Sequence, residues 1–385
     1  MTFPDVVPVL TDGRVALRAH RPDDLEAMHE QCTDPDTQRW TSVPAAYSRA
    51  DAAAFLASRA DGWEIGSGWS FAVEAPDGLG PSRFSGSIGI RLLGPGLGEI
   101  GFGMHPDVRG RGVTTAAVRL LLDWAFTVQG LQTMLWQAIE GNDASLRVAW
   151  KTGFTFEGRT RAHVPQRGQQ VDGWRGTLAA GDSREPKTRW LDAVTLTDGH
   201  VRLRELRLGD EQRYLETIND PESQRWLGTI PFPRDPAGFG RYYARRCLGS
   251  AAGASVEWVV ADADDDRYLA TMNLFGFHSL DYRSAEVGYR THPDARGRGV
   301  LKAAMRLVLE HAFGSPDDGG LGLGRVSLGA GDGNVGSQGV ALATGFTATG
   351  RDRQCYDLLD GSVVDLVRFD ILKSEFATGV DLRLR

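Results

Sequence analysis

The strongest constraint on the fold is an internal repeat that spans nearly the whole chain. Four segments occur twice, in the same order, and the two copies lie 186 to 192 residues apart. The pairs are LTDGRVALR (10–18) with LTDGHVRLR (196–204), DPDTQRW (34–40) with DPESQRW (220–226), HPDVRGRGV (105–113) with HPDARGRGV (292–300), and TGF (152–154) with TGF (344–346). This spacing is far above the roughly 20–50-residue period of stacked repeats. The sequence therefore predicts a duplicated domain.

The repeat sets the domain boundaries. We expect an N-terminal domain at 1–182, a linker at 183–189 that is polar and contains proline, and a C-terminal domain at 190–385. The composition, 41% hydrophobic and 24% charged, is that of ordinary globular domains.

Each copy shows the same predicted order of elements. Alternating apolar and polar residues at 69–74, 85–92 and 99–105 indicate strands, and residues 22–32 and 48–63 have helix-start signals. Residues 113–125 carry apolar side chains at helical spacing. A further strand, a short helix and final strands follow, so we predict an α+β fold around a mixed sheet.

Several classes of protein are disfavoured. The net charge of −7 argues against nucleic acid as a partner. No run approaches the roughly 18 apolar residues of a membrane span, and the N-terminus lacks a basic and apolar leader, so we expect a cytoplasmic protein without a membrane partner. Three distant cysteines without CxxC spacing support no metal site.

A glycine-containing turn is the first candidate for ligand binding. The residues 109–113, RGRGV, join a strand to a helix, and residues 296–300 repeat them at the same junction. A helix N-terminus offers unpaired N–H groups and partial positive charge, so it binds phosphate well. Glycine allows close approach of a ligand, and arginine adds charged donors. The alternative is a tight structural turn with solvated arginines.

These motifs together resemble a family. HPDxRGRG before an amphipathic helix, then N-x-x-S and an aliphatic stretch ending in GF, is similar to the GNAT superfamily of acyl-CoA-dependent N-acyltransferases. LxDGxVxLR, DPxxQRW and the ExG strand most resemble the branch that acetylates N-terminal amines of ribosomal proteins. The resemblance implies two tandem GNAT-like domains, each with a mixed six- to seven-stranded sheet whose central parallel strands splay apart. It also implies acetyl-CoA, or another acyl-CoA, as co-substrate and no metal.

The resemblance further implies which residues bind the coenzyme. They belong to the strand end, the glycine turn and the asparagine before the short helix. In the first copy they are Met104, Arg109, Gly110, Arg111, Gly112, Val113, Thr114 and Asn142, and in the second Arg296, Gly297, Arg298, Gly299, Val300 and Asn334. The last small position of the turn is Thr114 in the first copy and Leu301 in the second, so we expect the first domain to bind coenzyme better.

Four side chains are candidates for the chemistry. Amide formation from a thioester requires a neutral amine, a stabilised oxyanion and a protonated leaving thiol. Glu99 and Glu286 occupy matching strand positions, and the resemblance implies that they take the amine proton; alternatively they are structural carboxylates. Ser145 and Ser337 are implied to face the thioester sulfur, while Asn142 and Asn334 also suit helix capping. Backbone N–H groups near residues 102–104 are expected to bind the oxyanion.

Other residues have open interpretations. Asp172 and Asp365 either attract an ammonium or lie at a strand edge, and Trp40 and Trp226 either line an acceptor pocket or pack in the core. The run 314–336 has nine glycines and is expected to be looped or mobile in part.

The sequence therefore predicts an N-acyltransferase, monomeric or homodimeric. It moves an acetyl or related group from acyl-CoA to a primary amine of a protein N-terminus, peptide or small molecule, by direct transfer in a ternary complex. The alternative is that one or both domains bind acyl-CoA, or a partner, without catalysis.

Overall fold

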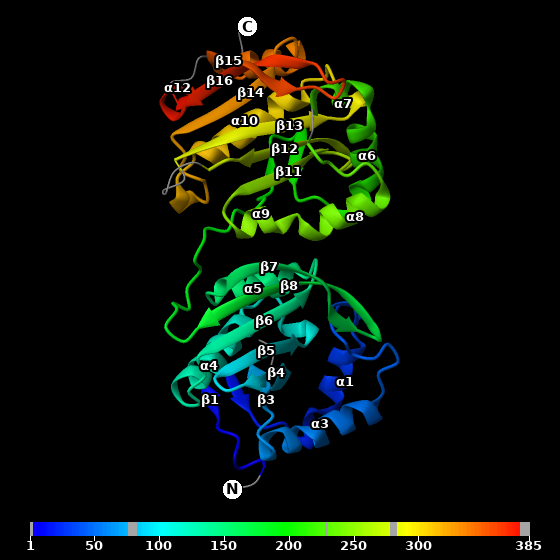
Figure 1. Cartoon of the computed structure of the whole chain (residues 1–385), viewed down its shortest axis with the longest axis vertical. Coiled ribbons are helices and arrows are strands. Elements are labelled where there is room, and N and C mark those ends of the chain that lie inside the picture. The colour runs from blue at the N-terminus through cyan, green and yellow to red at the C-terminus, as the bar shows by residue number, and fades with distance from the viewer. Residues whose placement is uncertain (1–2, 76–82, 228–229, 278–282, 378–385) are drawn as a thin grey trace. The chain divides into compact units, whose positions relative to one another are not determined.

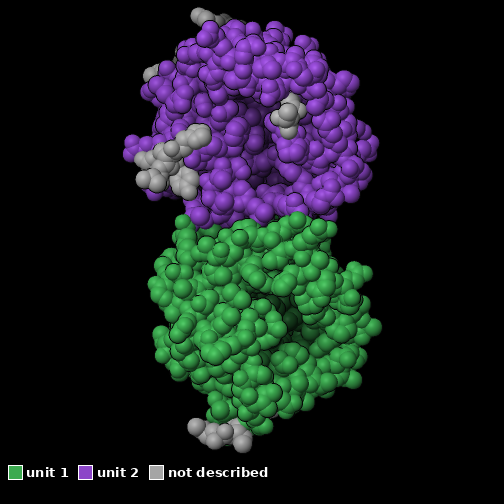
Figure 2. All heavy atoms as spheres, viewed as in Figure 1, with its two compact units in different colours: residues 1–187 green, residues 188–385 purple. Residues whose placement is uncertain are grey.

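The computed structural model describes residues 3–75, 83–227, 230–277 and 283–377 (Figure 1). The chain divides into two compact units, Met1–Lys187 and Thr188–Arg385 (Figure 2). The division falls inside the segment predicted as a linker, and both ends of that segment are bonded to their own unit. Glu185 pairs with Arg119 at 3.2 Å, and Arg189 Nη1 donates to the carbonyl of Leu321 at 3.0 Å.

The first unit is a single mixed sheet with helices on both faces (Figure 1). Its strands lie in the order β1-β2-β3-β4-β5-β6-β8-β7. The strands are β1 Leu10–Thr11, β2 Ala16–Arg18, β3 Gly68–Ala75, β4 Arg83–Gly94, β5 Leu97–Met104, β6 Thr133–Ile139, β7 Thr155–Gln166 and β8 Gln169–Ala179. The helices are α1 Leu25–Thr33, α2 Pro35–Trp40, α3 Arg49–Glu64, α4 Val113–Thr127 and α5 Asp143–Lys151.

The second unit repeats this topology, with the strand order β9-β10-β11-β12-β13-β14-β16-β15. The strands are β9 Leu196–Thr197, β10 Val201–Arg204, β11 Ser255–Asp262, β12 Tyr268–Phe275, β13 Ser284–Thr291, β14 Arg325–Gly331, β15 Thr347–Asp357 and β16 Val363–Leu372. The helices are α6 Glu211–Asn219, α7 Pro221–Leu227, α8 Pro236–Arg245, α9 Cys247–Ala251, α10 Val300–Phe313, α11 Val335–Ala343 and α12 Lys373–Ala377. Two mixed α+β domains are thus confirmed. Each sheet has eight strands within the described residues, one more than the expected maximum of seven.

The repeated LxDGxVxLR segment forms the first hairpin of each unit and attaches it to the first helix. Asp12 Oδ1 accepts hydrogen bonds from the backbone N–H groups of Arg14 (2.9 Å) and Val15 (2.8 Å), which closes the β1–β2 turn. Arg18 at the end of β2 donates both guanidinium arms to Asp24 at 2.8 and 2.9 Å, and both side chains are buried. Arg204 and Asp210 form the same pair in the second unit, at 2.9 Å for both arms. Because a buried charge needs a partner, the arginine that ends the motif is paired with an aspartate six residues later in both units.

The helix after the glycine turn packs its apolar stripe on the sheet, as its periodicity predicted. In α4 the side chains of Ala117, Leu121 and Ala125 are fully buried, and in α10 Ala304 and Val308 are too. Burying a leucine of this kind contributes about 2 kcal/mol, so the stripe fixes the helix start relative to the strands.

The two central strands of each sheet separate part-way along their length. In the first unit β5 and β6 pair in parallel only from residues 97–100 with 133–136, although both strands continue. In the second unit β13 and β14 pair only at 284–286 with 325–327. The splayed geometry is therefore confirmed, and beyond these residues the two central strands do not pair with each other in the part of the chain that the structure describes.

The glycine-rich run 314–336 is a loop followed by a strand. The loop is bonded to the end of α10: Gly320 N–H donates to Ser315 (2.8 Å) and Leu323 N–H donates to Ala312 (2.8 Å). Leu323 is fully buried, and a Cβ on Gly320 would lie 2.4 Å from the Gly314 carbonyl carbon. The looped part was predicted, and the glycines there allow close backbone packing. Residues 325–331 then form β14.

Candidate active site

Both glycine turns leave an open helix start. Gly112 precedes α4 and Gly299 precedes α10 in the left-handed region, with φ of 78° and 77°, and neither start has a side-chain cap among the described residues. Gly110 and Gly297 also have positive φ, 74° and 70°. A Cβ on any of the four would meet no atom within 4 Å. The turn thus leaves open space beside each helix start, which carries the partial positive charge of the helix end.

The guanidinium group of the first arginine in each turn is bonded to an aspartate and is not a free donor at the helix start. Arg109 Nη2 lies 2.6 Å from Asp34 Oδ2 and 2.8 Å from Thr37 Oγ1, and Arg296 bonds Asp220 in the same way. Asp34 also caps α2, because it accepts from Thr37 N–H at 2.8 Å. Burial opposes ionisation, but the hydrogen bonds from Arg109 and Thr37 hold the pKa of Asp34 below its usual value. This contact between turn and α2 explains why DPxxQRW recurs.

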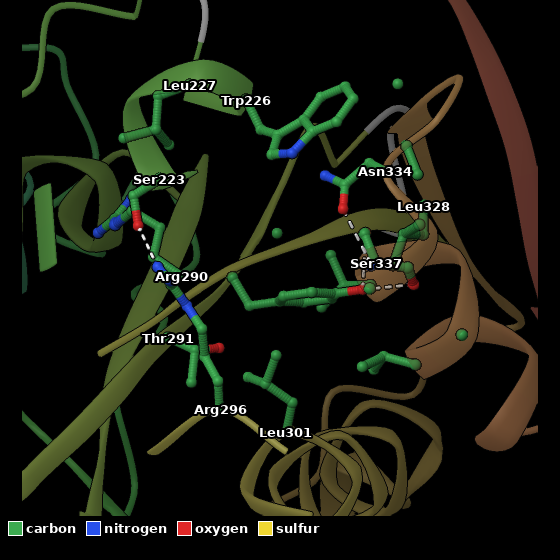
Figure 3. A pocket seen from close by; sticks show the side chains of 18 of the residues that line it. Ser223, Trp226, Leu227, Arg290, Thr291, Arg296, Leu301, Leu328, Asn334 and Ser337 are labelled. Carbon is green, nitrogen blue, oxygen red and sulfur yellow. Dashed lines mark hydrogen bonds between the residues drawn. The ribbon is translucent and has the colours of Figure 1, made fainter. Parts of the chain in front are cut away.

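A cavity of about 1360 Å³ lies in the second unit, where β13 and β14 separate (Figure 3). Its wall includes the glycine turn, the start of α11 and, on the other side, residues of α7. The predicted site residues in the wall are Glu286, Arg296, Gly297, Arg298, Gly299, Val300, Asn334 and Ser337. Figure 3 shows Asn334 and Ser337 on one side and Ser223, Arg290 and Arg296 on the other. Leu301 also lines the cavity, partly buried against the core, and does not close it.

The two N-x-x-S segments have matching geometry. Asn142 Oδ1 accepts from the backbone N–H of Ser145 at 3.1 Å, and Asn334 Oδ1 accepts from Ser337 N–H at the same distance. The capping role is therefore present in both units. The cap joins the asparagine amide oxygen to the serine backbone N–H, so it does not involve the serine hydroxyls.

Each serine hydroxyl has an aromatic partner that sequence reasoning missed. Trp136 Nε1 donates to Ser145 Oγ at 3.0 Å. The Tyr289 hydroxyl lies 3.0 Å from Ser337 Oγ and 3.1 Å from the Ser337 carbonyl oxygen. The sequence contains one indication of the tyrosine partner: EVGY in the second copy has a tyrosine where EIGF in the first copy has phenylalanine.

The two candidate glutamates are partly buried and paired with arginines from different strands. Glu99 Oε1 lies 3.0 Å from Arg91 Nη2, and Glu286 Oε2 lies 3.7 Å from Arg368 Nη1; the glutamate side chains are 24% and 25% exposed. Gly101, two residues after Glu99 on the same strand face, has open space where a Cβ would stand. The first unit thus has a carboxylate beside free volume.

The same face is filled in the second unit. Arg290 stands where the first unit has Gly103, and its Nη2 lies 3.1 Å from Glu257 Oε2, with only 7% of the arginine side chain exposed. Tyr242 donates its hydroxyl to Glu257 Oε1 at 2.6 Å, and the Phe232 ring lies 4.3 Å from the guanidinium. Burial alone lowers the pKa of an arginine, but Glu257 together with the neighbouring tyrosines more than offsets this effect, and the pKa of Arg290 is raised. The face is therefore occupied by a buried ion pair.

The aspartates of the last strands are already paired. Asp172 bonds Arg159 and accepts from Ala162 N–H at 2.8 Å, and Asp365 accepts from Arg351 Nη1 at 3.2 Å. The Ala162 backbone has a φ of 46°, so the carboxylate stabilises an irregular point of the β7–β8 hairpin. Both aspartates thus act within the hairpins, which favours the strand-edge interpretation over attraction of an ammonium.

Trp226 forms part of the cavity wall. The sequence left open whether this tryptophan lines a pocket or packs in the core. Its indole donates to Glu222 Oε1 at 2.9 Å, and its carbonyl oxygen accepts from the Tyr356 hydroxyl. Tyr356 lines the same cavity, and burial raises the pKa of its phenol. This aromatic pair joins α7 to β15 across the cavity mouth.

The described residues show neither a metal-binding cluster nor a membrane-spanning helix. The described residues contain no group of three or more histidine, cysteine, aspartate or glutamate side chains arranged to hold a metal ion. In the part of the chain that the structure covers, no helix has the length and hydropathy needed to cross a membrane.

Comparison with known families gives the class of the protein. The model of the acetyltransferase (GNAT) domain matches residues 14–155 and 200–347, that is, both units and well over half of the chain. The chain therefore belongs to the GNAT acetyltransferase family, and it is an acyl-CoA-dependent acetyltransferase at the level of that family.

Individual relatives match about one half of this chain. The "Putative ribosomal N-acetyltransferase YdaF" of Bacillus subtilis is 29% identical over 184 residues, which cover 46% of this chain and 93% of the relative. The "Uncharacterized N-acetyltransferase p20" of Bacillus licheniformis is 24% identical over 185 residues, 48% of this chain and 98% of the relative. Among solved structures, RimJ of Mycobacterium smegmatis in complex with CoA-disulfide has a TM-score of 0.43 at 18% identity, covering 48% of this chain and 89% of RimJ.

Proposed function

We propose that this protein transfers an acetyl group from acetyl-CoA to the primary amine of a protein N-terminus or peptide, directly within a ternary complex. The observation that carries the proposal is the cavity between the separating strands of the second unit, which reaches the uncapped helix start at Gly299. A relative named as a ribosomal N-acetyltransferase supports a protein N-terminus as acceptor.

The glycine turns would hold the coenzyme through the backbone. In this proposal the N–H groups of residues 110–114 and 297–301 bind the pyrophosphate, since a helix N-terminus with positive-φ glycines favours an anion. Arg109 and Arg296 brace the turn through Asp34 and Asp220, and their exposed parts remain proposed contacts of the pyrophosphate. Arg111, Arg298, Met104, Val113 and Val300 remain proposed contacts, as do Asn142 and Asn334.

Glu99 and Glu286 act as the bases in the proposed reaction. Each carboxylate takes a proton from the acceptor ammonium, directly or through water. The neutral amine attacks the thioester carbonyl, so that a C–N bond forms and the C–S bond breaks. Backbone N–H groups of the unpaired part of β5 or β13 stabilise the oxyanion.

Ser145 and Ser337 assist departure of the thiolate. Each hydroxyl donates a hydrogen bond to the leaving sulfur. The second amine proton, lost from the nitrogen as the amide forms, passes to the thiolate through solvent to give free CoA, and the proton held on the glutamate is released to solvent. The serine position is set by the asparagine cap, which is the same in both units.

The proposal is tested by calorimetric titration of acetyl-CoA into the full chain, together with thiol release in the presence of peptides with free N-termini. Glu99→Gln and Glu286→Gln in one chain should reduce turnover by about 100-fold or more while acetyl-CoA still binds. Glu26→Gln, at an exposed carboxylate paired with Arg49, is the matched control and should leave turnover unchanged. Failure of acetyl-CoA to bind the folded chain would refute the proposal. Binding without turnover on any free amine would favour the alternative of a non-catalytic acyl-CoA-binding module.

A further inference from the structure

The two serines are equivalent in backbone position but not in the partner of the hydroxyl. Asn142 and Asn334 have nearly the same dihedral angles, φ −79°, ψ 74° and φ −78°, ψ 68°, and the same 3.1 Å bond to the serine N–H. Any difference in how the hydroxyls are oriented must therefore come from the neighbouring side chains.

In the first unit the partner can only donate. Trp136 follows Leu135, the residue of β6 that pairs with Glu99, and its side chain is buried. An indole has one N–H and no acceptor, so the 3.0 Å contact fixes Ser145 Oγ as the acceptor. The serine proton is left to be donated elsewhere.

In the second unit the indole is absent, and a phenol hydroxyl is the hydrogen-bond partner of the serine. Leu328 stands in the place of Trp136, directly after Ser327, which pairs with Glu286. The hydroxyl of Tyr289 comes from the opposite strand, β13, and lies 3.0 Å from Ser337 Oγ. Burial raises the pKa of Tyr289 to about 12, so the phenol keeps its proton at neutral pH.

The two units differ in a complementary way at both central strands. The first unit has Phe102, without a hydroxyl, three residues after Glu99, where the second has Tyr289 three residues after Glu286. Each unit thus has an aromatic hydrogen-bond partner at the serine hydroxyl, taken from one or the other of the two separating strands. A general packing role does not explain why the loss of one polar group coincides with the gain of the other.

We infer that Trp136 is a positioning residue that orients the Ser145 hydroxyl, so that its proton points to the sulfur of the leaving CoA, and that Tyr289 holds the Ser337 hydroxyl at the corresponding place in the second unit. This inference rests on the proposed function, in which these serines face the thioester. The indole permits one direction of the hydrogen bond, whereas the phenol also accepts and also contacts the Ser337 carbonyl oxygen. Removal of the Trp136 donor therefore has the larger effect.

The test measures the ionisation of the CoA thiol bound to the full-length chain. Thiolate absorbance is followed against pH, and the same titration with desulfo-CoA is subtracted. Trp136→Phe should raise the bound thiol pKa by about 0.5 to 1 unit, because a hydrogen bond to the thiolate is weakened. Ser145→Ala should raise it at least as much. Adding Phe102→Tyr to Trp136→Phe, which copies the second unit, should restore the original value.

Kinetics with acetyl-CoA and a free-amine peptide give a second readout. Trp136→Phe should lower the kcat of the first unit about 3- to 10-fold, with KM for acetyl-CoA changed less than about twofold. Tyr289→Phe, which introduces the residue that the first unit has at that position, should lower the contribution of the second unit less. Trp174→Phe is the control, since Trp174 is equally buried and its indole N–H has no hydrogen-bond partner among the described residues.

The outcomes distinguish this inference from the proposed function on which it rests. A shift with Ser145→Ala but none with Trp136→Phe overturns the inference and leaves the proposed function intact. Equal effects of Trp136→Phe and Trp174→Phe, without rescue by Phe102→Tyr, also overturn it, because the effect would then come from packing. If Ser145→Ala leaves the thiol pKa unchanged, or if CoA does not bind, the proposed role of the serine fails and the inference falls with it.

Discussion

Replacing Asp34 by alanine tests the contact between α2 and the glycine turn. Asp34 caps α2 through the Thr37 N–H at 2.8 Å and accepts from Arg109 Nη2 at 2.6 Å. Loss of an N-cap costs about 1 kcal/mol. The ion pair adds about 0.5 to 1 kcal/mol, since Arg109 is 34% exposed and solvent screens the attraction. We expect the first unit to lose about 1.5 to 2 kcal/mol of unfolding free energy.

The measurement is urea unfolding of the full chain, with hydrogen exchange to assign the transition to the first unit. Asp36→Ala is the matched control on the same helix, because Asp36 is 70% exposed and 3.6 Å from Arg109, and it should cost at most about 0.5 kcal/mol. The pKa of Asp34 is lowered in the folded state, so its contribution is present above the ordinary value of 3.8 and disappears as pH falls below it. Equal destabilisation by the two variants, or a difference that persists in acid, would refute the reasoning.

Three further predictions concern other parts of the units. Gly112→Ala places a Cβ at a φ of 78°, so it should cost about 1 kcal/mol and weaken acetyl-CoA binding in calorimetry; unchanged affinity would exclude the turn from the coenzyme site. Glu257→Gln leaves the Arg290 charge buried without a counter-ion and should cost about 3 kcal/mol in urea, whereas Glu257→Leu with Arg290→Met should recover most of it. Burial lowers the pKa of His20 to about 4, so stability should fall as pH drops from 6.5 to about 4, and His20→Gln should remove that slope in unfolding titrations.

The domain organisation was predictable because it depends on patterns that the sequence repeats. Two copies of LxDGxVxLR and RGRG at nearly constant spacing imply two equal folds, and the apolar stripe of residues 113–125 implies a helix on a sheet. The position of the glycines at the start of α4 and α10 follows from the same local signals.

The partners of the site residues were not predictable. Arg109 was expected to bind a diphosphate, yet its guanidinium contacts Asp34, which lies 75 residues earlier. The charged pair of Arg290 and Glu257 forms between strands that are 33 residues apart in the chain. Such contacts depend on how the fold brings distant segments together, and a local motif has no information about the residue that the fold places beside it.

The narrow pairing between the central strands has a consequence for stability. Each sheet consists of two half-sheets that meet at four paired residues in the first unit and three in the second. A ligand that binds between the separated parts of the two central strands contacts both half-sheets. Such a ligand stabilises the folded unit as well as taking part in the reaction. At 100 times its dissociation constant such a ligand adds about 2.7 kcal/mol to the unfolding free energy of the unit that binds it. The cellular supply of coenzyme would then set how long each half of this protein resists unfolding.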